Sequence, residues 1–169
     1  MDKELSIKIL TPTIDLLSSE LKSAIYNLNQ ANIPALGAVN DFEHVQQLYD
    51  FCTYCYLAFK QEQLIAFVFV MDESSLYQSP NYQYFKLNYD SFLYIDRVAV
   101  SDLYQRKGIG AELYNHIYLK CIEANIPLCC EVNTLPRNEV SLNFHLKLNF
   151  KITEERPFGK KKVAMLIKE

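Results

Sequence analysis

The stretch from Phe92 to Ala124 constrains this chain most, because it combines a strand pattern, a short turn with two glycines and a helix pattern. Residues 92–100 are rich in aromatic and β-branched side chains, which is typical of a mostly buried strand. After a polar turn, apolar residues recur at helical spacing, at Ile109, Leu113, Ile117, Cys121 and Ala124. Gly108 and Gly110 therefore fall where a strand is followed by a helix.

The position of these glycines indicates a binding site for a diphosphate. The first turn of a helix has free backbone N–H groups and the positive end of the helix dipole, and both hold phosphate. Glycines let a ligand approach the main chain, and Arg106 and Lys107 add positive charge beside it. A Rossmann motif fits less well, since its third glycine would fall at Leu113, and no Walker A loop occurs. The remaining alternative is an ordinary strand–helix connection with basic flanks.

Residues 105–110, Gln-Arg-Lys-Gly-Ile-Gly, resemble the Q/R-x-x-G-x-G/A signature of the GNAT superfamily of N-acetyltransferases. The resemblance implies that amides at the helix start bind the pyrophosphate of acetyl-CoA, the cosubstrate, and that the preceding strand binds its pantetheine arm. It implies no metal. The cofactor-binding residues that it implies are Val98, Ala99, Val100, Gln105, Arg106, Lys107, Gly108, Ile109, Gly110, Ala111, Asn138, Phe144 and Lys147.

The whole sequence, residues 1–169, is expected to form a single domain of the α+β class. The order of predicted elements, β-α-α-β-β-β-α-β-α-β-β, is that of the GNAT fold, a mostly antiparallel twisted sheet flanked by helices. The strand of residues 92–100 and the strand of residues 127–132 enclose a helix, which predicts a parallel, right-handed unit. The resemblance further implies that these two strands splay apart and that the cofactor enters between them.

Three further segments carry structural expectations. A first strand with Leu5, Ile7 and Ile9 is followed by a long helix, predicted to start at residues 11–13 and to end near Gln30. Residues 32–40 form a loop that the resemblance places beside the acceptor, the alternative being a plain connection. Residues 72–91 are expected to be a tyrosine-rich loop, either a flap facing the substrate or a surface excursion that contacts a second copy.

Composition limits the partners and the compartment. A net charge of −3 and a pI near 5.7 argue against nucleic acid as a partner. No apolar run approaches the roughly 18 residues of a membrane span, and residues 1–10 lack a secretory signal, so a cytoplasmic protein is expected. The five cysteines, including the pair Cys52 and Cys55, are interpreted as small buried hydrophobic residues, because no second pair stands at zinc-binding spacing.

Two carboxylates are candidates for the general base of acyl transfer. Glu131 lies among apolar residues, where a lone carboxylate is costly unless it is paired or functional. A resemblance to ribosomal-protein-type GNAT enzymes implies that Glu131 takes the proton of the amine through a water molecule. Asp96 on the neighbouring strand is the rival base. An ion pair with Arg97 or Arg137 is the alternative interpretation for either carboxylate.

Residues 138–150, from Asn138 to Phe150, resemble the family pattern N-x-x-A/S-x-x-L/F-Y/H-x-K-L-G-F. It implies that Asn138 contacts the pantetheine arm, although Asn138 also suits a helix cap. His145 stands where many members have a tyrosine that protonates the leaving thiolate. A neutral imidazole can still donate one hydrogen bond to sulfur, so His145 is either this acid or a buried structural histidine. Asn149 replaces the usual glycine and tolerates a left-handed helix end.

These features predict an acetyl-CoA-dependent N-acetyltransferase. It would transfer an acetyl group to a primary amine, of a small molecule or a peptide, by direct attack in a ternary complex. One alternative is a non-catalytic domain that binds CoA and acts as a sensor, and another is an interaction module that uses residues 77–89. A homodimer could form through that segment or through the terminal hairpin, whose turn contains Gly159.

Overall fold

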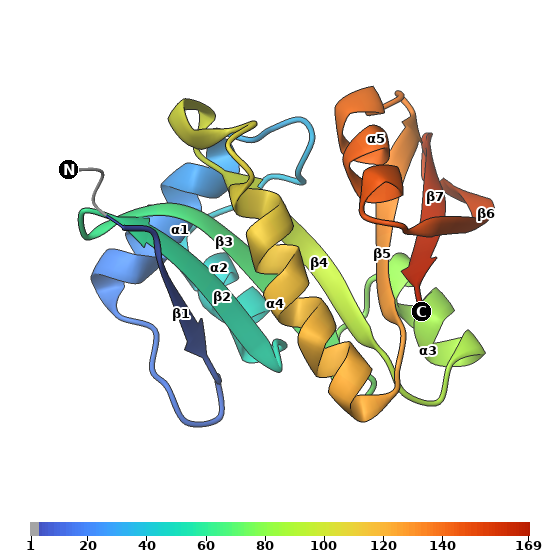
Figure 1. The fold of residues 1–169 in the computed structure, drawn as a ribbon, viewed down its shortest axis with the longest axis horizontal. Coiled ribbons are helices and arrows are strands. Elements are labelled where there is room, and N and C mark those ends of the chain that lie inside the picture. Colours follow the sequence, from blue (N-terminus) through green and yellow to red (C-terminus); the bar gives the residue numbers. More distant parts are fainter. Residues whose placement is uncertain (1–3) are drawn as a thin grey trace.

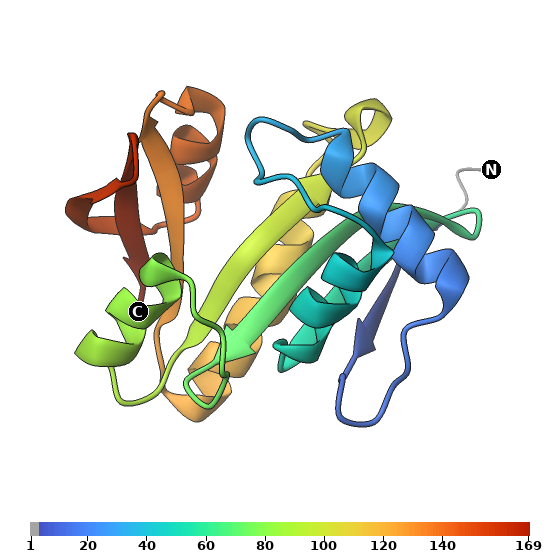
Figure 2. The same ribbon diagram turned by 180° about the vertical axis from the view of Figure 1, so that it is seen from behind.

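A computed structural model describes residues 4–169 as a mixed sheet of seven strands with helices on both faces (Figures 1 and 2). The strands are β1 (Ser6–Leu10), β2 (Tyr54–Lys60), β3 (Gln63–Asp72), β4 (Leu93–Val100), β5 (Leu128–Leu135), β6 (Lys151–Phe158) and β7 (Lys161–Lys168). The helices are α1 (Ser19–Gln30), α2 (Phe42–Asp50), α3 (Pro80–Asn88), α4 (Ile109–Ala124), α5 (Glu139–Lys147) and the short 3-10 helix η1 (Asp102–Tyr104). Residues 1–3, part of the stretch used to argue against a secretory signal, lie outside the described residues.

The strands lie in the order β1-β2-β3-β4-β5-β7-β6. Within residues 4–169, β4 and β5 form the one parallel pair, and all other neighbours are antiparallel. The parallel pairing covers only Leu93 with Leu128 and Tyr94 with Cys129, after which the two strands diverge (Figure 1). The predicted fold class and the splay of these strands are therefore confirmed.

Helices α1, α2 and α3 cover one face of the sheet, and α4 and α5 cover the other. Helix α4 buries the predicted apolar stripe against β2, β3 and β4, with Leu113 and Ile117 fully excluded from solvent. Ala124 was expected on this stripe but is exposed, because it is the last residue of α4 and Asn125 leaves the helix in a left-handed conformation. The splayed strands thus run between two helical layers.

A bulge in β4 shapes the centre of the sheet. Phe69 of β3 pairs with Arg97, but the next residue, Val70, pairs with Ile95, so Asp96 is an extra residue in β4. A bulge bends its strand and redirects the side chains beside it. It lies just beyond the point where β4 leaves β5.

Tight turns with positive φ close the two hairpins. The turn between β2 and β3 uses Gln61 and Glu62, with φ of 52° and 66°, which explains how a hairpin forms there without glycine. The turn between β6 and β7 uses Gly159, with φ of 59°, as the sequence predicted. Asn149 follows α5 with φ of 67°, which confirms its expected left-handed conformation.

The start of the first helix was predicted too early. Helix α1 begins at Ser19, and the hydroxyl of Ser18 caps it by accepting a hydrogen bond from the Leu21 amide at 3.2 Å. The preceding residues form a separate turn, in which the Asp15 carboxylate accepts a hydrogen bond from the Thr11 amide at 2.8 Å. Ile14, which lies within the stretch predicted to be helical, is 81% exposed. The start of α1 is therefore set by the cap at Ser18 and not by residues 11–13.

The tyrosine-rich segment is not a long loop, because it contains α3. Pro80 occupies the first turn of α3, and Tyr82 and Phe85, three residues apart, point one face of the helix into the core. The Tyr82 hydroxyl donates a hydrogen bond to the carbonyl of Asp72 at 2.7 Å, which fixes the helix to the end of β3. The segment packs on the sheet rather than extending away from it (Figure 2).

All five cysteines are buried as free thiols, which confirms their interpretation as small hydrophobic residues. Burial raises the pKa of the Cys121 thiol to about 12. Among the described residues, no helix has both the length and the apolar character needed to cross a membrane.

Candidate active site

The start of helix α4 has the geometry of an anion site. Gly108 stands before the helix with φ of 82°, in the left-handed region that suits glycine, and a Cβ there would meet no atom within 4 Å. The first helical hydrogen bond runs from the Glu112 amide to the Gly108 carbonyl at 2.9 Å. The amides of Ile109, Gly110 and Ala111 therefore have no acceptor within the helix. An open backbone and a set of free amides fit a phosphate group.

The loop before α4 is tied to the end of β4. The side-chain amide of Gln105 donates to the Val100 carbonyl at 3.1 Å and to the Asp102 carboxylate at 3.0 Å. Arg106 and Lys107 are exposed, and the Lys107 ammonium lies 5.2 Å from the centre of the Tyr104 ring. Two exposed cationic residues therefore directly precede Gly108 and the helix start.

Gly110 serves the packing of α4 against α5. A Cβ at this position would lie 3.3 Å from Cζ of Phe144, closer than an ordinary contact. The Phe144 ring also packs edge-on against Tyr114, with centroids 5.2 Å apart. Sequence reasoning assigned Gly110 only to the approach of a ligand, and the need to accommodate this ring was missed. Lys147, at the end of α5, is exposed.

Beyond Tyr94, the edge of β4 that faces β5 pairs with no strand within residues 4–169. This edge carries Val98, Ala99 and Val100, the residues expected to contact the pantetheine arm. At the start of α5, Asn138 caps the helix, because its side-chain oxygen accepts a hydrogen bond from the Ser141 amide at 3.1 Å. The cap that the sequence allowed is thus present, and contact of these four residues with a cofactor stays a prediction.

Glu131 is the most perturbed carboxylate of the site. Its Oε1 accepts hydrogen bonds from the Tyr94 hydroxyl at 2.9 Å and from the Asn81 side chain at 3.2 Å. Its Oε2 is buried and accepts no hydrogen bond from any residue of the described chain. Burial, and then the negative charge of Asp96, raise the pKa of Glu131 to about 8. Neither Asn81 nor Tyr94 was singled out from the sequence.

Asp96 is paired, unlike Glu131. The Arg97 guanidinium donates from Nε to Asp96 at 2.8 Å, and both side chains are nearly buried, at 5% exposed for Asp96 and 11% for Arg97. The second arm of Arg97 donates to the side-chain oxygen of Asn29 on α1 at 2.9 Å. Tyr77 also interacts with both members of the pair. The structure thus brings both candidate carboxylates together and gives Asp96 the predicted partner Arg97.

His145 lies on the other face of the sheet, packed in the α4–α5 layer and 3% exposed. Its Nδ1 lies 2.7 Å from the Ser141 carbonyl, which can only accept, so Nδ1 carries the proton. Its Nε2 therefore accepts the hydrogen bond from the Tyr114 hydroxyl at 2.9 Å. Burial lowers the pKa of His145, and the Ser141 carbonyl offsets part of this change. The imidazole is neutral, and both of its nitrogens are occupied.

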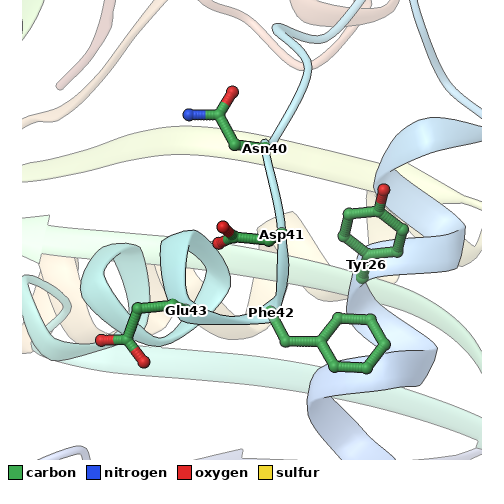
Figure 3. Close-up of a pocket in the computed structure, with 5 residues that line it drawn as sticks. All are labelled: Tyr26, Asn40, Asp41, Phe42 and Glu43. Carbon is green, nitrogen blue, oxygen red and sulfur yellow. The ribbon is translucent and has the colours of Figure 1, made fainter.

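A separate hollow of about 460 Å³ lies between α1 and the start of α2 (Figure 3). Figure 3 shows the ring of Phe42 beside that of Tyr26, and these rings stack edge-on with centroids 5.2 Å apart. Its other lining residues are Asn40, Asp41 and Glu43. Of the loop expected to line the acceptor, only Asn40 contributes. No residue of β4, β5 or α4 lines this hollow.

The missed residue Asn81 had a sequence signal. Ser79 and Pro80 form a helix start, and Tyr82 and Phe85 follow at helical spacing. A helix predicted there would have placed Asn81 in its first turn, next to a buried face. For cofactors, no group of three or more potential ligands suited to a metal ion was found within residues 4–169.

Comparison with known proteins agrees with this geometry. Residues 23–150 match the family model described as the acetyltransferase (GNAT) family. No curated protein sequence matches the chain. Similar solved structures include the ribosomal-protein-S18-alanine N-acetyltransferase from Escherichia coli, with 14% identity, 97% of this chain and 92% of that chain covered, and a TM-score of 0.68. Naa50 from Arabidopsis thaliana, in complex with the bisubstrate analogue CoA-Ac-MVNAL, has 19% identity, coverage of 97% and 99%, and a TM-score of 0.65. NAA60 from Arabidopsis thaliana, in complex with acetyl-CoA, has 12% identity, coverage of 98% and 99%, and a TM-score of 0.69.

Proposed function

This chain belongs to the acetyltransferase (GNAT) family and is an acyltransferase that uses acetyl-CoA, and from this premise we propose that it acetylates a primary amine by direct attack in a ternary complex. The observation that carries the proposal is the position of the Gly108 helix start beside the unpaired edge of β4. When bound, acetyl-CoA supplies the activated acetyl thioester. The amides of residues 109–111, with Arg106 and Lys107, would hold its diphosphate.

Glu131 is the proposed general base. Its Oε2 is free of hydrogen bonds within the described chain, and its raised pKa suits proton uptake near neutral pH. Asp96 is less suited to the role of general base, because its carboxylate forms an ion pair with the Arg97 guanidinium. In this proposal Asp96 and Arg97 shape the wall of the acceptor site, and the amine proton reaches Glu131 directly or through one water molecule.

For the leaving thiolate, the geometry supports a positioning role for His145 rather than direct proton donation. Its single proton is held by the Ser141 carbonyl, and Tyr114 occupies the other nitrogen. The pair of Tyr114 and His145 joins α4 to α5, so it fixes the helix that carries the diphosphate site relative to β5. The oxyanion of the reaction would be stabilised by a backbone amide of β4 near Val98.

The acceptor is proposed to be the amine of a peptide or a small molecule. The Naa50 structure contains a peptide-derived bisubstrate analogue, so peptides with a free amino terminus are the first acceptors to test. A cytoplasmic location, a homodimer and the absence of nucleic-acid partners stay predictions.

Release of free thiol from acetyl-CoA tests the proposal. We expect release that depends on an added amine, drawn from a panel of peptides, lysine and polyamines, and that falls at least tenfold in Glu131→Gln. Binding of acetyl-CoA without release of thiol for any amine would instead support the non-catalytic reading.

A further inference from the structure

Two donors from different parts of the fold meet at one oxygen of Glu131. The Tyr94 hydroxyl comes from β4, at 2.9 Å, and the Asn81 side-chain nitrogen comes from the first turn of α3, at 3.2 Å. Both donor residues are buried, with Tyr94 fully so and Asn81 6% exposed. The other oxygen, Oε2, is buried and accepts no hydrogen bond within residues 4–169. The two oxygens of Glu131 are therefore in different situations.

This asymmetry needs a reason, because a buried oxygen without a hydrogen bond is costly. Helix α3 follows β3 and precedes β4 in the chain and packs on one face of the sheet, where the Tyr82 hydroxyl holds it by donating a hydrogen bond to the Asp72 carbonyl at 2.7 Å. Helix α3, held by the Tyr82 hydrogen bond, thus places the Asn81 side chain against Glu131. Tyr82 and Phe85 supply the buried apolar side chains of α3, whereas the buried side chain of Asn81 is polar and donates to Glu131.

We propose that Asn81 and Tyr94 are positioning residues, which hold Oε1 of Glu131 so that Oε2 is the atom that takes the proton of the acceptor amine. Helix α3 would then contribute a positioning residue to the acetyl-transfer site. The inference rests on the proposed role of Glu131 as the base. In the step itself, a nitrogen–hydrogen bond of the amine breaks and an oxygen–hydrogen bond forms at Oε2. The electron pair that stays on nitrogen forms the bond to the acetyl carbon, and the carbon–sulfur bond breaks, with its electrons leaving on the thiolate.

The other groups around Glu131 make the effect of these donors measurable. Strand β4 contributes the paired Asp96 and Arg97, and within residues 4–169 the other titratable groups that interact with Glu131 include Tyr77 before α3, Tyr114 of α4 and the adjacent Cys130. Burial and Asp96 raise the pKa of Glu131, whereas the hydrogen bonds from Tyr94 and Asn81 lower it. Loss of either donor therefore raises the pKa of Glu131 further.

The test is the pH profile of kcat/KM for Asn81→Ala and Tyr94→Phe, measured with acetyl-CoA and the first amine of the panel that supports thiol release. We expect each variant to shift the alkaline rise of the profile to higher pH. For each unit of this shift, the rate at pH 7 falls about tenfold. The rate well above both pKa values stays within a few-fold of wild type, and KM for acetyl-CoA does not change. A structural loss would instead lower the rate equally at every pH.

A readout independent of turnover follows the same carboxyl group. The infrared band of protonated Glu131, identified by its absence in Glu131→Gln, should titrate at higher pH in both variants than in wild type. Asn88→Ala is the matched control, since Asn88 lies on the same helix but is exposed, and its side chain donates to the Tyr84 carbonyl. It should shift neither the profile nor the band. Tyr94→Phe removes only the hydroxyl oxygen. If Asn81→Ala does not fold, the pH profile and the infrared band of Tyr94→Phe still test the inference.

The outcomes separate this inference from the proposed function. If Glu131→Gln abolishes turnover but the profile and the infrared band of both donor variants match wild type, the positioning role is wrong and the base assignment survives. If Glu131→Gln turns over normally, the base assignment fails. In that case a shifted infrared band in Asn81→Ala would show only that the hydrogen bond between Asn81 and Glu131 exists. The inference about the proton-accepting oxygen would be overturned, because it requires Glu131 to be the base.

Discussion

A Cβ added to Gly110 on α4 would lie 3.3 Å from Cζ of Phe144 on α5, whereas a Cβ added to Gly108 would meet nothing within 4 Å. Gly108 and Gly110, which look equivalent in the sequence, thus have different structural roles. Gly108 is needed for its backbone conformation, with φ of 82°, and Gly110 for the close approach of a ring.

Substitution of Gly110 by leucine and of Gly108 by alanine should therefore separate packing from backbone strain. Gly110→Leu displaces the Phe144 ring and should destabilise the protein by about 1–3 kcal/mol. Gly108→Ala should cost about 1 kcal/mol through the strained left-handed conformation alone. Thermal unfolding checks both values, and isothermal calorimetry with acetyl-CoA tests whether binding weakens. Unchanged stability in Gly110→Leu would contradict the packing role of this glycine.

The stability of the protein should fall with rising pH because of Glu131. Its pKa is about 8 in the folded protein, against an ordinary value of 4.5, so the folded state keeps a proton that the unfolded chain releases. The stabilisation is complete below about pH 4.5 and is lost as the pH rises through 8. Glu131→Gln cannot ionise and should be more stable than wild type by about 2–4 kcal/mol at pH 8.5.

Chemical denaturation across pH 5 to 9 measures this difference. Glu139→Gln is the control, because the exposed carboxylate of Glu139 is paired with Arg137, which lowers its pKa. It should not remove the alkaline loss of stability. Parallel curves for wild type and Glu131→Gln would show that Glu131 is not perturbed in solution.

The sequence predicted the strands, the glycine turn and the cap at Asn138, because each depends on residues that are close together in the chain. It could not predict which side chains meet across the sheet. Asn81 and Glu131 are fifty residues apart, and their contact depends on how α3 packs, which local spacing does not determine. His145 was assigned from a family position, and only the three-dimensional structure places Tyr114 and the Ser141 carbonyl against its two nitrogens.

Replacement of His145 should show how much this residue contributes to the free energy of unfolding at low pH. Burial lowers the pKa of His145, so below about pH 6.5 the unfolded chain takes up a proton that the folded protein resists. The contribution of His145 to stability is present above that pH and is lost as the pH falls through the lower folded value. His145→Gln should flatten this acid limb, whereas His145→Ala should cost about 2–4 kcal/mol through the cavity and the unpaired Tyr114 hydroxyl.

Activity measurements on the same variants decide between positioning and acid catalysis. If His145 acts by joining α4 to α5, His145→Gln should retain most turnover at neutral pH and His145→Ala should raise KM for acetyl-CoA. A loss of kcat of a hundredfold or more in His145→Gln, with normal binding of acetyl-CoA, would instead identify His145 as the proton donor.

Asp96→Asn should move the activity profile in the direction opposite to Asn81→Ala. The charge of Asp96 raises the pKa of Glu131, and its removal leaves the Arg97 guanidinium unpaired beside the site, which lowers that pKa further. The rise of kcat/KM should therefore shift to lower pH, so that the variant gains relative activity below pH 7 even if the unpaired Arg97 costs about 3 kcal/mol of stability. If Asp96 were the base, the variant would lose turnover at every pH. The sign of the shift thus tests which carboxylate takes the proton, without any knowledge of the natural acceptor.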